Sequence, residues 1–258
     1  MLYWQSQNIP VKIAASTLNS EATYWAFWQY YIPKVGFSLS ALTLTKAKCE
    51  KIQSPTICDT SSKLHFNCNT SRAIVFGPVR YAGITLPHLY TTQSIGQLCS
   101  LIGHLYLQDK TADLFLIDIS TIQLIVGSTT QFFNLPYHSY HMLVEPSWLR
   151  SIWCLIDNLQ FRVALCQAYV PSISRVRDCS IIDKFATLRL PKTDMQRLNR
   201  CRLYLQVLHL SDITSADGTT ILQGYKEGNR CPYRTSKLTW PYQPRLPASD
   251  WLLWQRTL

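Results

Sequence analysis

Arg72–Leu105 reads Arg-Ala-Ile-Val-Phe-Gly-Pro-Val-Arg-Tyr-Ala-Gly-Ile-Thr-Leu-Pro-His-Leu-Tyr-Thr-Thr-Gln-Ser-Ile-Gly-Gln-Leu-Cys-Ser-Leu-Ile-Gly-His-Leu. A basic, apolar segment turns at Gly77-Pro78 and turns again at Ala82-Gly83, because these residues favour turns over regular structure. A long helix is then expected over Leu89–Leu107. Its apolar stripe, which we expect to face a core, consists of Ile95, Leu98, Ile102 and Leu105.

Helical spacing of apolar residues, with capping residues at the ends, extends over most of the chain. The expected helices are Ser20–Ile32, Thr45–Gln53, Pro55–Phe66, Leu89–Leu107, Thr111–Val126, one starting at Pro146, Thr193–Leu210 and Ser249–Leu258. Pro33 should end the first of them. Phe161–Tyr169 alternates as a strand does, and Asp217-Gly218 fits a tight turn. The sequence therefore predicts a mainly α fold, an irregular helical bundle with long loops and a few short strands.

The composition is that of a globular protein with an uneven basic charge. Apolar residues make up 47% and charged residues 16% of 258 residues, and the net charge is +10. Residues 171–258 hold 14 basic and 7 acidic side chains. This excess is typical of a protein that binds a polyanion, most simply nucleic acid, although a soluble basic surface explains it as well.

Cysteine usage and the N-terminus indicate an intracellular protein, in the nucleus or the cytoplasm, rather than a secreted one. The nine Cys are widely spaced with no Cys-x-x-Cys pair, which favours reduced thiols. Met1–Ala15 lacks the basic and apolar regions of a signal peptide. Tyr81–Gln108 is uncharged, but polar residues interrupt it throughout, so we expect no membrane span.

Residues for metal-dependent catalysis are not apparent. Polymerases and nucleases need carboxylates clustered on metal ions, and the chain has no adjacent Asp pair. Asp212 and Asp217 flank a turn, and turn chemistry accounts for both. We therefore assign no catalytic residue, no metal ligand and no cofactor.

Basic residues that alternate with aromatics are the remaining signal, because Arg binds phosphates and aromatic rings stack on bases. The candidate nucleic-acid-binding residues are Arg72, Arg80, Arg197, Arg200, Arg202, Arg234 and Lys237. Solvated helix faces and ordinary loop polarity are the alternative explanation for each cluster.

From about Leu18 onward the chain resembles the reverse-transcriptase-like polyproteins of non-long-terminal-repeat retrotransposons. The segments that carry the resemblance are Thr45–Pro55, Val75–Tyr90, Gln97-Leu98 with Leu101–Leu105, Arg197–Leu205 and Ser249–Trp254. In that family this region follows the catalytic palm, whose metal-binding aspartates lie upstream of the residues present here. The resemblance implies a helical, thumb-like region over residues 16–170 and a truncated basic connecting region over residues 171–258. Residues 1–15 would be an unstructured or unrelated leader.

The resemblance also implies a function. The chain would be a catalytically inactive fragment of a retroelement reverse transcriptase that binds RNA or DNA non-specifically through phosphates. The alternative is a basic helical adaptor that binds other proteins. Without a palm to pack against, Trp25, Phe27, Trp28 and Tyr31 would stay exposed and favour self-association. Ala82 stands where the family usually has a second Gly, which would be costly if this turn needs a positive φ.

Overall fold

The structure is a computed structural model that describes residues 2–173, 175–176, 178–228 and 240–258. The chain forms two compact units, Met1–Leu107 and Gln108–Leu258. The division lies far from the expected boundary at residue 170. Contacts cross that expected boundary: Ser180 Oγ donates to the Gly127 carbonyl at 2.6 Å, and the Tyr140 hydroxyl donates to Asp183 Oδ1 at 2.8 Å.

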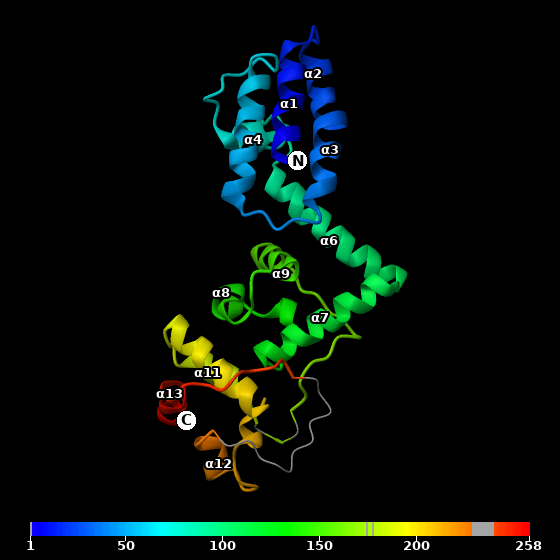
Figure 1. Cartoon of the computed structure of the whole chain (residues 1–258). Coiled ribbons are helices and arrows are strands. Elements are labelled where there is room, and N and C mark those ends of the chain that lie inside the picture. Colours follow the sequence, from blue (N-terminus) through cyan, green and yellow to red (C-terminus); the bar gives the residue numbers. More distant parts are fainter. Residues whose placement is uncertain (1, 174, 177, 229–239) are drawn as a thin grey trace. The chain divides into compact units, whose positions relative to one another are not determined.

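Helices are the only regular secondary structure in the described part of the first unit. They are α1 (Leu2–Ala15), α2 (Ser20–Ala26), the π-helix η1 (Phe27–Tyr31), α3 (Ile32–Leu39), α4 (Lys46–Ser61), α5 (Arg72–Phe76), the 3₁₀ helix η2 (Val79–Tyr81) and α6 (Leu89–Leu107). Helix α1 lies between α3 and α4 (Figure 1). Residues 1–15 were expected to be an unstructured or unrelated leader; the described ones form a helix, and Ile9 and Ile13 pack inside the unit.

Pro33 does not end its helix, contrary to expectation. Proline lacks an N–H and its ring clashes with the carbonyl four residues earlier. The π-helical turn before it widens the backbone, and the Ile32 N–H bonds to the Phe27 carbonyl five residues back. Helices α2, η1 and α3 thus follow one another without a break. Phe27 and Tyr31 are fully buried, while Trp25 is 52% exposed, so only part of the expected aromatic patch is present.

Helix α4 merges two segments that we expected to be separate. Thr45 caps it as predicted and accepts from the Lys48 N–H at 3.3 Å. Pro55, expected to start a new helix, lies inside α4 instead. One helix therefore carries the charges of Lys46–Lys51 and the buried side chains of Thr56 and Ile57.

The two turns after α5 form a compact, hydrogen-bonded bend. The N–H groups of Ile84, Thr85 and Leu86 donate back to the carbonyls of Ile74, Gly77 and Val75 at 2.8–2.9 Å. Ala82 has a φ of 58°, so the turn does need the left-handed conformation that favours glycine. This bend exposes the side chains of η2 to solvent.

Helix α6 has the predicted bounds, but it buries the opposite face from the one we predicted. Ile95 and Ile102 are 54% and 57% exposed, whereas Gln93 and Gln97 are each 1% exposed. The Gln93 amide bonds both to the Leu44 N–H (3.1 Å) and to the Leu44 carbonyl (3.0 Å). Gln93 thus faces inward because its side-chain amide provides hydrogen-bond partners for the backbone N–H and carbonyl of Leu44.

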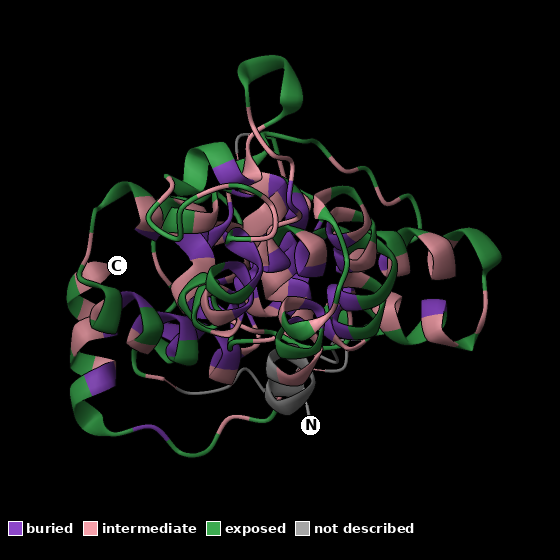
Figure 2. Ribbon diagram, turned by 90° about the horizontal axis from the view of Figure 1, so that it is seen from above, coloured by how far each residue is buried: buried purple, intermediate pink, exposed green. Residues whose placement is uncertain are grey.

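The second unit is also mainly helical, which confirms the predicted fold class. Its helices are α7 (Lys110–Val126), η3 (Phe132–Asn134), α8 (Tyr137–Tyr140), η4 (His141–Leu143), α9 (Trp148–Asn158), α10 (Ile181–Thr187), α11 (Lys192–Leu205), η5 (Leu210–Asp212), α12 (Gln223–Lys226) and α13 (Ala248–Thr257). Helix α13 packs on α11, and Trp254 is fully buried there. Buried positions alternate with exposed ones along the helices (Figure 2).

The predicted strand at Phe161–Tyr169 is wrong, because the segment pairs with side chains rather than with another strand. Gln131 bonds to the N–H and carbonyl of Leu165, and Asn134 does the same to Val163, at 2.7–3.2 Å. In the described part of the chain, β pairing is limited to the isolated bridges Ser180–His209 and Thr214–Ile221. The second bridge flanks the predicted Asp217-Gly218 turn, in which Gly218 has a φ of 77°.

Candidate functional site

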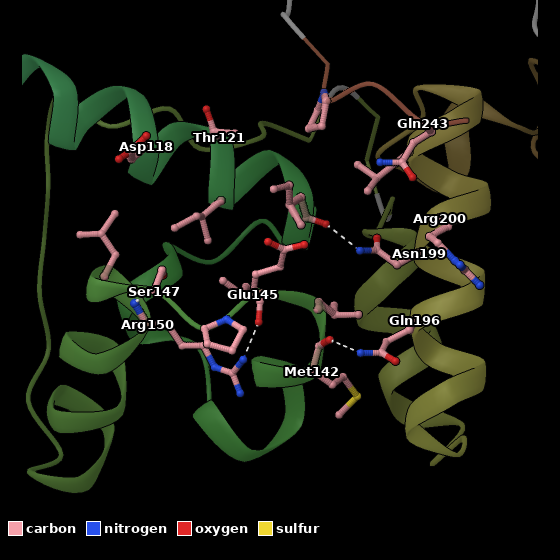
Figure 3. Close-up of a pocket in the computed structure, with 18 of the residues that line it drawn as sticks. Asp118, Thr121, Met142, Glu145, Ser147, Arg150, Gln196, Asn199, Arg200 and Gln243 are labelled. Atoms are coloured by element: carbon pink, nitrogen blue, oxygen red, sulfur yellow. Dashed lines mark hydrogen bonds between the residues drawn. The ribbon is translucent and has the colours of Figure 1, made fainter. Parts of the chain in front are cut away.

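A cleft of about 1130 Å³ opens in the second unit (Figure 3). Three segments supply most of its lining: α7, residues 142–150 and α11. Pro241 and Gln243 complete it. Its volume is that of a pocket for a sizeable ligand or a peptide segment.

One wall of the cleft is apolar and aromatic. Phe115 of α7 stacks on Trp148 of α9, with ring centroids 5.0 Å apart and an interplanar angle of 7°. Trp148 is held at the start of α9, where Ser147 caps the helix by accepting from the Arg150 N–H. The sequence gives no sign of this pair, because its members are 33 positions apart.

The facing wall is the polar side of α11. Gln196 donates to the Met142 carbonyl at 2.7 Å, and Asn199 donates to the Ile125 carbonyl at 3.0 Å. Both bonds are visible in Figure 3. These amides fix α11 against the other two segments that line the cleft, so the site is shaped by the core of its own unit.

Two predicted site residues, Arg197 and Arg200, lie on this wall, but a buried acid neutralises part of their charge. Arg197 and Arg200 contact the two carboxylate oxygens of Asp250 at 2.6 and 3.1 Å. Arg197 also pairs with Asp194 at 3.4 Å. The hydrogen bond that Arg197 donates to Asp250 raises the pKa of Arg197 above its usual value. These arginines serve first to bind α13 to α11.

The remaining charges of the cleft balance as well. The lining includes two basic residues, Arg150 and Lys192, and two acidic residues, Asp118 and Glu145. Arg150 itself donates to the Val144 carbonyl at 2.7 Å. The cleft is therefore close to neutral, which suits a polyanion poorly.

Arg202 was predicted to bind nucleic acid, and the structure shows that it does not reach solvent. Its side chain is fully buried and bonds to the carbonyls of Leu124 (2.9 Å), Ile125 (2.5 Å) and Val207 (3.1 Å). Asn199 accepts a fourth bond at 2.9 Å. A cation at the end of α7 is favourable, because helix C-termini carry unpaired carbonyls and a partial negative charge. Burial lowers the pKa of Arg202 to about 9, which leaves it charged at neutral pH.

The first unit carries a basic surface that the cleft lacks. Arg72 is exposed, and its guanidinium lies 3.4 Å from Ser54 Oγ on α4. Lys51 is one turn before Ser54, and Lys48 is one turn earlier still; both are exposed. We call Lys48, Lys51 and Arg72 the α4 basic face. None of the three has an ion-pair partner among the described residues.

Arg80 lies on the bend after α5, together with an aromatic ring. Its guanidinium carbon is 4.8 Å from the centroid of the Tyr81 ring, and Tyr81 is 72% exposed. An exposed cation beside an exposed ring is the pairing expected of a residue that stacks on bases. The last two predicted site residues, Arg234 and Lys237, lie outside the described residues.

The described residues contain no group of three or more His, Cys, Asp or Glu side chains able to hold a metal ion. Among the described helices, none combines the length and apolar character needed to cross a membrane. Comparisons with protein-family models, with curated proteins and with solved structures gave no match.

Proposed function

We propose that the chain is a non-catalytic protein that contacts nucleic acid through the α4 basic face, as a fragment of the post-palm region of a reverse-transcriptase-like polyprotein. The observation that carries this proposal is the position of Arg72, whose guanidinium lies 3.4 Å from Ser54 Oγ on α4 and has no ion-pair partner among the described residues. Met1–Leu107 holds 8 basic and 3 acidic residues. Uncompensated cations in such a row release counterions from phosphates when they bind.

Arg80 and Tyr81, on the bend after α5, offer a second kind of contact with nucleic acid. A base can stack on the exposed tyrosine ring, and the guanidinium beside it can reach a phosphate. Both interactions are indifferent to sequence. The proposal is therefore one of weak, sequence-independent and salt-dependent binding, with a preference for single strands.

Binding is tested by fluorescence anisotropy of labelled single-stranded RNA and DNA at several salt concentrations. The variant Lys48→Ala/Lys51→Ala/Arg72→Ala should bind more weakly to every sequence. Its salt slope should fall by about 2, since each lost phosphate contact removes roughly 0.7 for a single strand. The matched control, Lys192→Ala/Lys226→Ala/Arg256→Ala, removes three exposed cations from the second unit. Equal losses in both variants, or an affinity independent of salt, would contradict the proposal.

The cleft supports a second candidate function, that of a protein-binding adaptor. A near-neutral cleft with a stacked Phe115–Trp148 wall and a polar facing wall suits a peptide with an apolar anchor. Selection from a displayed library of random peptides should then enrich sequences that bind the natural chain but not the Trp148→Ala variant. Enriched peptides that bind both proteins equally would place the interaction outside the cleft.

A further inference from the structure

The outer face of α6 is apolar over three turns and has no partner in the first unit. Its exposed members are Ile95 (54%), Ile102 (57%), Tyr106 (85%) and Cys99. The buried residues Gln93, Gln97 and Leu101 lie on the opposite side of the helix. An exposed apolar strip of this kind is typical of an interaction surface.

The spacing of these residues is that of a two-helix seam. The steps from Ile95 to Cys99, Ile102 and Tyr106 are four, three and four residues. These steps reproduce the alternating a and d positions of a heptad, which face a partner helix in a coiled coil. We call Ile95, Cys99, Ile102 and Tyr106 the α6 seam.

We propose that the α6 seam binds the same seam of a second copy of this chain, in antiparallel orientation about a two-fold axis. In an antiparallel pair, a positions lie opposite d positions. Ile95 then faces Tyr106 of the second copy, and Cys99 faces Ile102 of the second copy. Each of these pairs joins a smaller side chain to a larger one. Two copies of the seam are therefore complementary in the sizes of their side chains.

Charge also favours a second copy over a different partner. Tyr81–Gln108 contains no Asp, Glu, Lys or Arg, so two copies bring no like charges together. A charged partner would find no counterion on the seam. The seam therefore disfavours a different partner helix whose flanking positions are acidic or basic.

The flanks of the seam are compatible with this pairing. Leu98 and Leu105 lie on one side of the seam. In the dimer, Leu98 of one copy would lie beside Leu105 of the second copy, and the reverse. Gly103 lies on the other side, and a Cβ there would meet no atom within 4 Å. The absence of a side chain allows a second helix to approach closely on that flank.

The length of the seam sets the strength of the dimer. A seam of three turns buries less area than a standard stable interface, so we expect a dissociation constant on the order of micromolar or weaker. Sedimentation of the full chain should therefore show a reversible, concentration-dependent monomer–dimer equilibrium. A chain that stays monomeric at every concentration would refute the proposal.

Two charge variants test whether the seam is the interface. Ile102→Glu should weaken association at least roughly a hundredfold, because each dimer would bury two unpaired carboxylates. Ile117→Glu is the matched control, since Ile117 of α7 is 61% exposed and lies outside the seam. Circular dichroism should show both variants folded, because each site is exposed in the monomer. Dimerisation that survives Ile102→Glu would place the interface elsewhere.

Cross-linking tests the orientation. In a Cys99→Ser background, Ile95→Cys/Tyr106→Cys should form an interchain disulfide between positions 95 and 106, identified by mass spectrometry. Within one helix these positions are about 16 Å apart, too far for a disulfide. Ile95→Cys alone should give no dimer linked at position 95. A disulfide between the two copies of position 95 would indicate parallel pairing and overturn the proposed geometry.

Discussion

Replacing Gly127 by alanine should severely destabilise the second unit. Gly127 ends α7 with a φ of 71°, and its N–H donates to the Gln123 carbonyl at 2.8 Å. A Cβ at this position would lie 2.6 Å from Arg202 Nη1 and 2.7 Å from Arg202 Cζ. The substitution therefore strains the backbone and displaces the buried guanidinium that binds the end of α7.

The two costs can be assigned separate magnitudes. An alanine in the left-handed conformation costs about 1–2 kcal/mol. Displacement of Arg202 from one carbonyl loses a charged hydrogen bond, which is worth about 1.5–3 kcal/mol. The free energy of unfolding should thus fall by about 2.5–5 kcal/mol, which corresponds to a loss of at least about 5 °C in Tm for a unit of this size.

Urea and thermal unfolding of the full chain, followed by circular dichroism, measure this loss. Gly224→Ala is the matched control, because a Cβ at Gly224 of α12 meets no atom within 4 Å. It should be neutral or slightly stabilising. In a double-mutant cycle with Arg202→Met, the clash should appear as a coupling of more than about 0.5 kcal/mol. A Gly127→Ala loss below about 1 kcal/mol, or strict additivity in the cycle, would refute this reasoning.

Three further predictions concern Ala82, Gln93 and Cys201. Ala82→Gly should stabilise the chain by about 1 kcal/mol in thermal unfolding, because it relieves a positive φ, whereas Ala22→Gly inside α2 should destabilise it by a similar amount. Gln93→Leu should cost about 1–3 kcal/mol and accelerate hydrogen exchange at Leu44, whose N–H and carbonyl lose their partner; unchanged exchange would contradict this. Burial raises the pKa of Cys201 from its usual value near 9 to about 12. The stability that the buried thiol contributes should therefore be full below pH 9 and decline toward pH 12. A Cys201→Ala variant with the same alkaline unfolding profile would show that another group is responsible.

The bounds of α6 were predicted correctly, but its buried face, which carries Gln93 and Gln97, was not. The period of Ile95 and Ile102 identified the helix and its bounds, because helical spacing is a local property. It could not identify the buried face. Gln93 and Gln97 face inward because the backbone of residues 42–44 lies beside them and needs hydrogen-bond partners, and that proximity exists only in the folded unit.

For the charged residues, too, the sequence predicted local features but not which side chains are accessible in the folded unit. Composition predicted a basic protein, and the local sequence around Arg197 and Arg200 predicted a basic helix. Only tertiary structure decided which cations are available to a ligand. Arg202 is buried at the end of α7, Asp250 pairs with Arg197 and Arg200 from a helix about fifty residues away, and Arg72 has no ion-pair partner among the described residues.

The sequence by itself determined the mainly α fold, most helix positions, the Thr45 cap and the Asp217-Gly218 turn, because spacing, capping and turn preferences act over a few residues. Tertiary structure alone decided that the chain divides after Leu107, that Phe161–Tyr169 pairs with side-chain amides, and that α6 exposes its apolar face. Each of these depends on contacts between residues distant in sequence. Local preferences define which elements form, and the packing of those elements defines which of their faces can bind.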